Sequence, residues 1–185
     1  MLEVGKGGID RAELQAALRD GHLLRSVADG DRESQVAFYR LFREQVASIL
    51  FRLIGDDERL ADFVESVFVL CYQRAGSFKN DTSLAIWLYQ VCVDVATDAL
   101  SSSDKEQRDA PDSWALGENH DQRVARELLG KLPLARRIVF FLNEVEGLPV
   151  KDIAYIVRAG SFVVRGRLYV ARREFYELAG RVQHT

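Results

Sequence analysis

The sequence has few of the residues that build metal centres and disulfide frameworks. Its 185 residues include only two cysteines, three histidines and three prolines. Cys71 and Cys92 lie inside apolar segments, which favours buried free thiols in a reducing compartment over the alternatives of a disulfide or a shared metal site. The histidines are scattered, with no Cys or His partner at zinc spacing, so no metal or other cofactor is expected.

Long apolar runs and catalytic clusters are also missing. No stretch approaches the roughly 18 unbroken apolar residues that a membrane span needs, and Met1–Asp10 lacks the basic start and apolar core of a secretory signal. No group of histidines, cysteines or carboxylates has catalytic spacing, which argues against an enzyme. The apolar fraction of 48% is ordinary for a folded protein. We therefore expect a folded cytoplasmic protein without membrane insertion or enzymatic activity.

The net charge of −3 hides an asymmetry along the chain. Residues 1–110 carry 13 Lys/Arg and 19 Asp/Glu, a net charge of −6, whereas residues 111–185 carry 12 and 9, a net charge of +3. The acidic half argues against a phosphate-binding surface spread over the whole molecule. The basic half permits such a surface near the C-terminus.

Apolar residues recur at three- and four-residue steps through the first half, which predicts amphipathic helices. Three segments show this pattern: Ser34–Gly55, Glu58–Gly76 and Leu84–Leu100. Gly55 is expected to end the first helix, and Thr82 or Ser83 to cap the third. Short connections between the helices predict a bundle around one core.

The composition changes after Leu100, where a polar stretch without sustained periodicity predicts a linker. Beyond it, Pro133 and Pro149 each stand where a helix is expected to begin, and Gly147 is expected to close one. The predicted fold is all-α, with two small helical domains. Its divisions are a helical N-terminal extension at residues 1–22, a bundle at 23–100, a linker at 101–121 and a helix-turn-helix domain at 122–185.

The segment Val150–Arg173 has the pattern of a helix-turn-helix motif. The side chains expected to face the core are Ile153, Ala154, Val157, Val164, Leu168 and Ala171. Arg158-Ala159-Gly160 supplies the turn between the two helices. Arginines on the other faces of the second helix suit contacts with phosphates or guanine edges. The alternative is a solvated basic helix that packs only on its apolar side.

Both halves resemble the extracytoplasmic-function (ECF) sigma factors of bacterial RNA polymerase. The stretch "LPLARRIVFFLNEVEGLPVKDIAYIVRAGSFVVRGRLYVARREF" is similar to their C-terminal domain. In the first half, "LLRSVADGDRESQVAFYRLF" resembles the family's opening helices, "ADFVESVF" its polymerase-binding helix and "WLYQVCVDVATDAL" its promoter-melting helix. The resemblance covers about Leu23 to Leu178, with the pieces in the family's order and spacing.

The resemblance implies partners and site residues. It places Asp62 and Glu65 on the surface that binds the clamp helices of the large polymerase subunit, with Phe63 and Val67 packed behind them. In the recognition helix it assigns promoter DNA contacts to Ser161, Phe162, Val163, Arg165, Arg167, Arg172 and Arg173. Arg172 and Arg173 would lie near phosphates, and Phe162 would meet either a thymine methyl group or another protein. An anti-sigma factor is a further expected partner.

The promoter-melting helix departs from the family's pattern. Gln90, Val93 and Asp94 stand where the family usually has Arg, Arg and Asn, and Ser101-Ser102 replaces a pair of arginines. Asp94 and Asp98 lie four residues apart on one helix face, so they are expected to repel a phosphate backbone together. Aromatic residues that could stack on bases or belong to the core are Tyr72, Phe78, Trp87 and Tyr89.

Three functions stay open at this point. The first is an ECF sigma factor that directs promoter-specific initiation. The second is a sigma-like interaction protein that binds an anti-sigma factor or the polymerase without opening promoters, which the acidic melting helix favours. The third is a plain helix-turn-helix transcription regulator.

Overall fold

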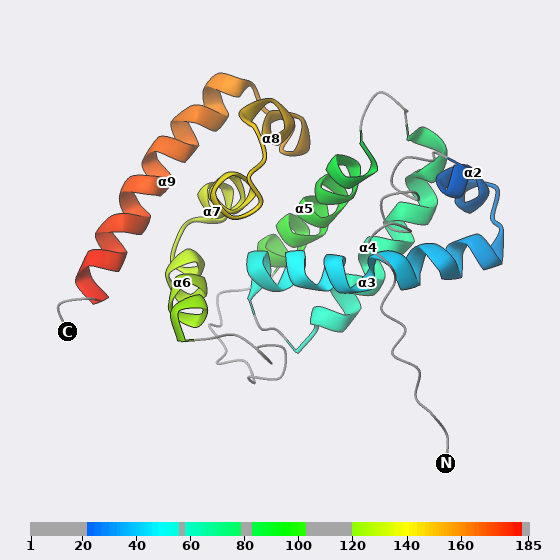
Figure 1. The fold of residues 1–185 in the computed structure, drawn as a ribbon, viewed down its shortest axis with the longest axis horizontal. Helices are drawn as coiled ribbons and strands as arrows, with labels where there is room; N and C mark the ends of the chain where they lie inside the picture. The colour runs from blue at the N-terminus through cyan, green and yellow to red at the C-terminus, as the bar shows by residue number, and fades with distance from the viewer. Residues whose placement is uncertain (1–21, 56–57, 79–82, 103–119, 183–185) are drawn as a thin grey trace, which may run out of the picture.

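The computed structural model describes residues 22–55, 58–78, 83–102 and 120–182. Every regular element in these ranges is helical, which confirms the predicted all-α class. Figure 1 shows the helices in two groups, with α2 to α5 on one side and α6 to α9 on the other. The predicted N-terminal extension and most of the predicted linker lie outside the described residues.

The first bundle contains the segments in which the sequence predicted three helices. Its elements are α2 (His22–Ala28), α3 (Arg32–Ile54), α4 (Leu60–Arg74), a 3-10 turn η1 (Ala75–Ser77) and α5 (Leu84–Ser102). Helices α3, α4 and α5 pack against one another, and α2 packs on α3 and η1. The core between them is built from aromatic and aliphatic side chains, among which Phe38 and Phe42 are fully buried.

Local signals explain where these helices begin and end. The carboxylate of Asp31 accepts a hydrogen bond from the backbone N of Ser34 at 2.9 Å and so caps α3, a cap that the sequence analysis missed. Gly55 ends α3 as predicted, with φ at 96°, a region that glycine enters without steric cost. At the start of α5, Ser83 Oγ accepts a hydrogen bond from the backbone N of Ile86 at 3.2 Å, as its predicted capping role requires.

Helix α5 is apolar around most of its circumference and lies near the middle of the molecule. Its buried side chains are Leu84, Trp87, Leu88, Tyr89, Val91, Cys92, Val93, Val95, Ala96 and Ala99. The segment Leu84–Ser101 is long and apolar enough to cross a membrane by length and composition, yet 56% of it is buried inside the protein. Apolar residues on every side of a helix are typical of one that is covered by neighbours on more than one face.

The second bundle forms the helix-turn-helix region. Its elements are α6 (His120–Gly130), α7 (Leu134–Phe140), a π-helical segment η3 (Phe141–Val145), α8 (Val150–Ile156) and α9 (Ser161–Val182). Pro133 and Pro149 are the N-cap residues of α7 and α8, one position earlier than the first helical position that the sequence analysis expected. Gly147, at φ 68°, follows η3 and allows the chain to turn toward α8.

The predicted helix-turn-helix motif consists of α8, the turn Arg158-Ala159-Gly160 and α9. Val164, Leu168 and Ala171 are buried, as predicted, and hold α9 to the bundle. In α8, Ile153 is buried as predicted, while Ala154 and Val157 are half-buried against the core. Ile156, which was not among the side chains predicted to face the core, is fully buried.

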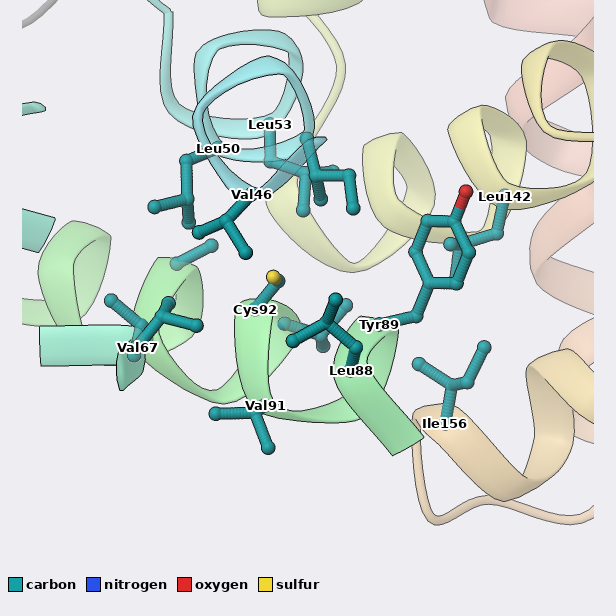
Figure 2. Packing of buried hydrophobic residues seen from close by; sticks show 14 of the residues in the cluster. Val46, Leu50, Leu53, Val67, Leu88, Tyr89, Val91, Cys92, Leu142 and Ile156 are labelled. Atoms are coloured by element: carbon teal, nitrogen blue, oxygen red, sulfur yellow. The ribbon is translucent and has the colours of Figure 1, made fainter. Parts of the chain in front are cut away.

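The two bundles meet along a seam, the interface of α5 with α7 and α8 and of α3 with α6 and α7. Buried residues of both bundles form one continuous apolar cluster across it. Figure 2 shows Leu142 and Ile156 of the second bundle beside Tyr89 of α5, with Val46 and Leu50 of α3 facing Cys92. One side of α5 therefore faces its own bundle and another side faces the second bundle.

Candidate functional site

The outer face of α4 presents the acidic residues that the family resemblance assigns to polymerase binding. Asp62 and Glu65 are exposed, whereas Val67 is fully buried beneath them. Phe63 is half-buried, and the guanidinium of Arg59 lies 5.1 Å from the centre of its ring. The helix therefore offers two carboxylates to a partner on a surface that is anchored by the core.

The outer face of α9 is the most exposed apolar and basic surface that the described residues offer on a single helix. Phe162 is 87% exposed and Val163 is 43% exposed at the start of this helix, and Tyr169 is 70% exposed two turns later. Arg165 is exposed between them, with no ion-pair partner among the described residues. This face therefore combines a guanidinium with apolar groups that match thymine methyls.

The other recognition-helix residues of the sequence analysis lie in different surroundings. Ser161 is half-buried where α9 begins, and Arg167 is half-buried along a groove at the seam. Arg172 donates from Nε to Glu144 Oε1 and from Nη2 to Asn143 Oδ1, each at 2.8 Å, so it ties α9 to η3. Arg173 is exposed and lies 3.7 Å from Glu177 along the same helix.

The acidic position in α5 is bound by arginines on both sides. Asp94 Oδ2 accepts from Arg74 Nη1 of α4 at 2.6 Å. The same carboxylate accepts two hydrogen bonds from Arg158, from Nη1 to Oδ1 at 2.5 Å and from Nη2 to Oδ2 at 2.9 Å. Arg158 belongs to the turn of the helix-turn-helix, so this bidentate pair crosses the seam. The Asp94 charge, expected from the sequence to face DNA, is neutralised by its own chain.

The pKa of Asp94 reflects these contacts. Partial burial acts to raise the pKa of this carboxyl, but the hydrogen bonds and positive charges of Arg158 and Arg74 outweigh that effect and lower it below its ordinary value. The pKa of Arg158 is raised by the same carboxylate. A carboxyl with a lowered pKa is ionised at neutral pH, so the pair is fully charged there and loses its stabilising effect only as the pH falls through the lowered pKa.

Polar contacts continue along the seam. Gln90 Nε2 donates to the backbone O of Tyr155 in α8 at 3.1 Å. Tyr89 donates its hydroxyl hydrogen to Glu146, and Arg52 Nη1 lies 3.3 Å from Glu146 Oε1. Burial, followed by the contact with Glu146, raises the pKa of the Tyr89 hydroxyl well above its ordinary value, so it stays a donor. Two residues that depart from the family's pattern, Gln90 and Asp94, thus contact α8 or the turn that follows it.

Arg137 of α7 joins the ends of two helices at the seam. Its Nη1 donates to the backbone O of Leu53, at the end of α3, at 2.8 Å. Its Nη2 donates to the carbonyl oxygens of Gly130 at 2.5 Å and Leu132 at 3.2 Å. Burial lowers the pKa of Arg137, but a guanidinium stays charged in proteins. A cation at these carbonyl groups is favourable because helix C-termini carry partial negative charge.

The aromatic residues of α5 and the two cysteines, Cys71 of α4 and Cys92 of α5, are core residues. Trp87 and Tyr89 are 5% and 7% exposed, which decides between the stacking and core interpretations in favour of the core. Cys71 and Cys92 are free and buried, as predicted. Burial raises the pKa of Cys71 to about 12 and that of Cys92 well above its ordinary value. Within the described residues, no group of three or more His, Cys, Asp or Glu side chains could hold a metal ion.

Comparisons with known proteins point to one family. No protein-family model matches the chain. The chain is 27% identical to the ECF RNA polymerase sigma-E factor of Escherichia coli K12, over 84% of this chain and 91% of the relative. It is 22% identical to the RNA polymerase sigma-H factor of Pseudomonas aeruginosa, over 83% of this chain and 90% of the relative. These relatives span both bundles, and they confirm the family resemblance.

Solved structures with similar folds agree. CnrH, solved in complex with the cytosolic domain of CnrY, matches with a TM-score of 0.66 and 20% identity, over 88% of this chain and 98% of that one. The sigma factor RpoE of Bartonella quintana, solved with the anti-sigma factor NepR, matches with a TM-score of 0.61 and 16% identity, over 78% and 95%. At these identities the likeness concerns the fold.

Proposed function

We propose that this chain, which belongs to the ECF sigma factors, binds core RNA polymerase and directs promoter-specific transcription initiation. The observation that carries the proposal is the similarity to curated ECF sigma factors across more than four fifths of the chain. A sigma factor supplies binding and recognition to the polymerase and catalyses no reaction itself. The proposed place of action is the cytoplasm, where the polymerase works.

The proposed polymerase contact is the exposed carboxylate pair of α4. Asp62 and Glu65 point away from a buried Val67, which keeps the position of the helix surface fixed. The clamp helices of the large polymerase subunit are the proposed partner. Phe63, half-buried beside these carboxylates, adds apolar contact area to the same face.

The proposed promoter contact is the first half of α9. Phe162, Val163 and Arg165 are exposed on it, which leaves them available to the edges of bases in the major groove. Ser161 and Arg167 flank this face and complete the proposed contact. Arg173 and Arg172 are the proposed phosphate contacts, and the guanidinium of Arg172 also pairs with Glu144.

An anti-sigma factor is the third proposed partner. Two proteins with this fold, CnrH and RpoE of Bartonella quintana, were solved with CnrY and with the anti-sigma factor NepR, respectively. We extend this type of partner to the present chain as a proposal.

Transcription from genomic fragments with purified core polymerase tests the proposed function. The chain should produce transcripts from defined start sites that are missing with core enzyme alone. In the matched test of polymerase binding, Asp62→Ala with Glu65→Ala should weaken the complex about tenfold, whereas Glu44→Ala, at an exposed position of α3, should not. Binding to core polymerase without any transcript would contradict the sigma function and favour the sigma-like interaction protein.

The interaction protein is kept as the second candidate because of α5. Where the family's pattern has two arginines and an asparagine, this helix has Gln90, Val93 and Asp94, and all three face the second bundle or its turn. Duplex binding by the chain in the absence of polymerase binding would favour the plain helix-turn-helix regulator instead.

A further inference from the structure

One residue in the turn of the helix-turn-helix has an unusual backbone conformation. Arg158 has φ at 48°, and it is the single residue other than glycine with positive φ in the described part of the chain. Residues with a side chain rarely adopt this left-handed region, because their Cβ atom crowds the backbone there. A glycine would satisfy the turn at lower cost. An arginine at such a position calls for a compensating contact.

That contact is the bidentate ion pair with Asp94. The carboxylate is 16% exposed at the side-chain level, and its two oxygens receive three hydrogen bonds from two arginines. Arg74 comes from the same bundle as Asp94, so it holds the carboxylate in place. Arg158 comes from the other bundle and is the group that joins the two.

The ion pair lies beside an apolar contact that also covers α5. Val93 is 5% exposed, and it lines the same groove as Ile138 and Ile156 of the second bundle. Val93 directly precedes Asp94 and stands where the family usually has an arginine. Its side chain faces the second bundle. Gln90, at the other cation position, is bound to the backbone of α8. Residues at these three positions hold the bundles together.

We propose that Arg158 and Asp94 form a clasp that keeps the second bundle on the promoter-melting face of α5, so that the free chain inhibits its own strand-opening surface. This inference rests on the proposed sigma function for its consequence, although the clasp itself is a property of the isolated chain. The bundles must separate at the seam before α5 can meet a single strand. Binding to polymerase and promoter supplies the free energy of that separation.

The clasp is tested by the reactivity of a thiol placed under it. In a Val93→Cys variant of the full chain, the introduced thiol should react with a small maleimide only when the seam opens. Its labelling rate then measures the fraction of open molecules. Mass spectrometry of peptides reads the buried Cys71 and Cys92 in the same sample, so unfolding of the first bundle is detected separately.

In this background, Arg158→Gly should raise the labelling rate at position 93 about tenfold, because a hydrogen-bonded ion pair is lost. Glycine fits the positive φ of the turn, so the second bundle should stay folded. Arg158→Glu should raise the rate further, since a second carboxylate then faces Asp94. Combining Arg158→Glu with Asp94→Arg should return the rate toward that of the unmodified pair. Arg165→Glu, the same charge change on the exposed face of α9, should leave it unchanged.

Transcription by the same variants tests the inhibitory consequence. Arg158→Gly and Asp94→Asn should each increase the yield of open promoter complexes several-fold. An unchanged labelling rate in Arg158→Gly and Arg158→Glu would overturn the clasp. Faster labelling with no gain in open complexes, from a chain that does transcribe, would overturn its inhibitory role. Faster labelling with no transcripts from any variant would support the clasp and count against the proposed sigma function.

Discussion

The family resemblance assigns two helices, α5 and α9, to promoter DNA. The two helices differ in how far their surfaces are exposed to solvent. On α9, Phe162, Val163 and Arg165 are exposed to solvent. On α5, the corresponding surface is covered by α7 and α8, and Asp94 is paired with arginines. The chain in this state therefore presents its proposed recognition surface, while residues of the proposed strand-opening surface contact its own second bundle.

The difference shows that positions on α5 that have lost the family's usual residues now contact the second bundle. A sequence comparison alone suggests only that α5 has become a poor DNA surface, since each lost cation removes about one released counterion. The structure adds that Gln90 and Asp94 have gained partners in the second bundle. The same substitutions that weaken contact with phosphates thus strengthen contact between the bundles.

The largest expected contrast between the two helices is in thiol reactivity. Cys71 lies on α4, which packs against α5, and its pKa of about 12, against an ordinary value of 9.0, lowers its thiolate fraction at pH 8 about a thousandfold. Cys92 of α5, whose pKa is also raised, should behave alike. A thiol introduced by Tyr169→Cys on α9, where the native side chain is 70% exposed, should react at the rate of a free peptide. Alkylation kinetics read by mass spectrometry check this, and rapid alkylation of Cys92 in the folded chain would refute the burial of this side of α5 in the first bundle.

Promoter binding should be more sensitive to substitutions on α9 than to substitutions on α5. Arg165→Ala with Arg167→Ala should weaken promoter-specific binding about a hundredfold, because a good arginine contact to a base contributes about 1–3 kcal/mol. Binding to core polymerase should stay near normal. Filter binding or fluorescence anisotropy on promoter and nonspecific duplexes measures the effect, with Lys131→Ala, at an exposed position directly after α6, as control. Unchanged promoter binding would show that α9 is not the reading helix.

The seam should depend strongly on Arg137. Arg137→Ala removes three hydrogen bonds to the backbone oxygens of Leu53, Gly130 and Leu132 and leaves these acceptors without that donor. We expect a loss of about 2 kcal/mol in the free energy of unfolding, because removing one partner of a partly buried charged hydrogen bond is costly. Urea unfolding followed by circular dichroism measures it. A loss below about 0.5 kcal/mol would mean that water replaces the guanidinium without penalty.

Restoring the electrostatics of α5 should have the smallest effect of this series. Asp94→Asn with Ser101→Arg and Ser102→Arg should raise the yield of open promoter complexes several-fold, because it adds cations and removes a carboxylate. Permanganate footprinting of the melted strand measures the opening. Ser48→Arg, which adds a cation at an exposed position of α3, serves as control and should have no effect. No gain in the triple variant would mean that strand opening uses other residues or does not occur.

Much of the fold could be predicted because each helix has a local signal. Apolar periodicity identified the helices, glycine marked their ends at Gly55 and Gly147, and a basic segment with a short turn marked the helix-turn-helix. The burial of Val164 and Leu168 followed from their spacing alone. The cap by Asp31 was missed although an aspartate directly before an apolar periodic run is a recognised signal for it.

The seam could not be predicted because its contacts join residues far apart in the sequence. Asp94 and Arg158 are separated by 64 positions, and no local pattern reports such a pairing. Periodicity tells which face of a helix is apolar and leaves open what covers it. The one available signal was the breadth of the apolar surface on α5, which includes Tyr89 and Val93. Tyr89 lies beside Leu142 and Ile156 of the second bundle (Figure 2), and Val93 lines the groove at the seam. A helix apolar on more than one face requires more than one packing partner.

The labelling rate of the thiol in the Val93→Cys chain, compared between the free protein and its complex with core polymerase without promoter DNA, tests the central claim most directly. A chain that holds its own second bundle over α5 should react slowly when free. It should react at least tenfold faster in the complex with core polymerase alone, with Cys71 still protected. A fast rate in the free chain, equal to that in the complex, would contradict the account.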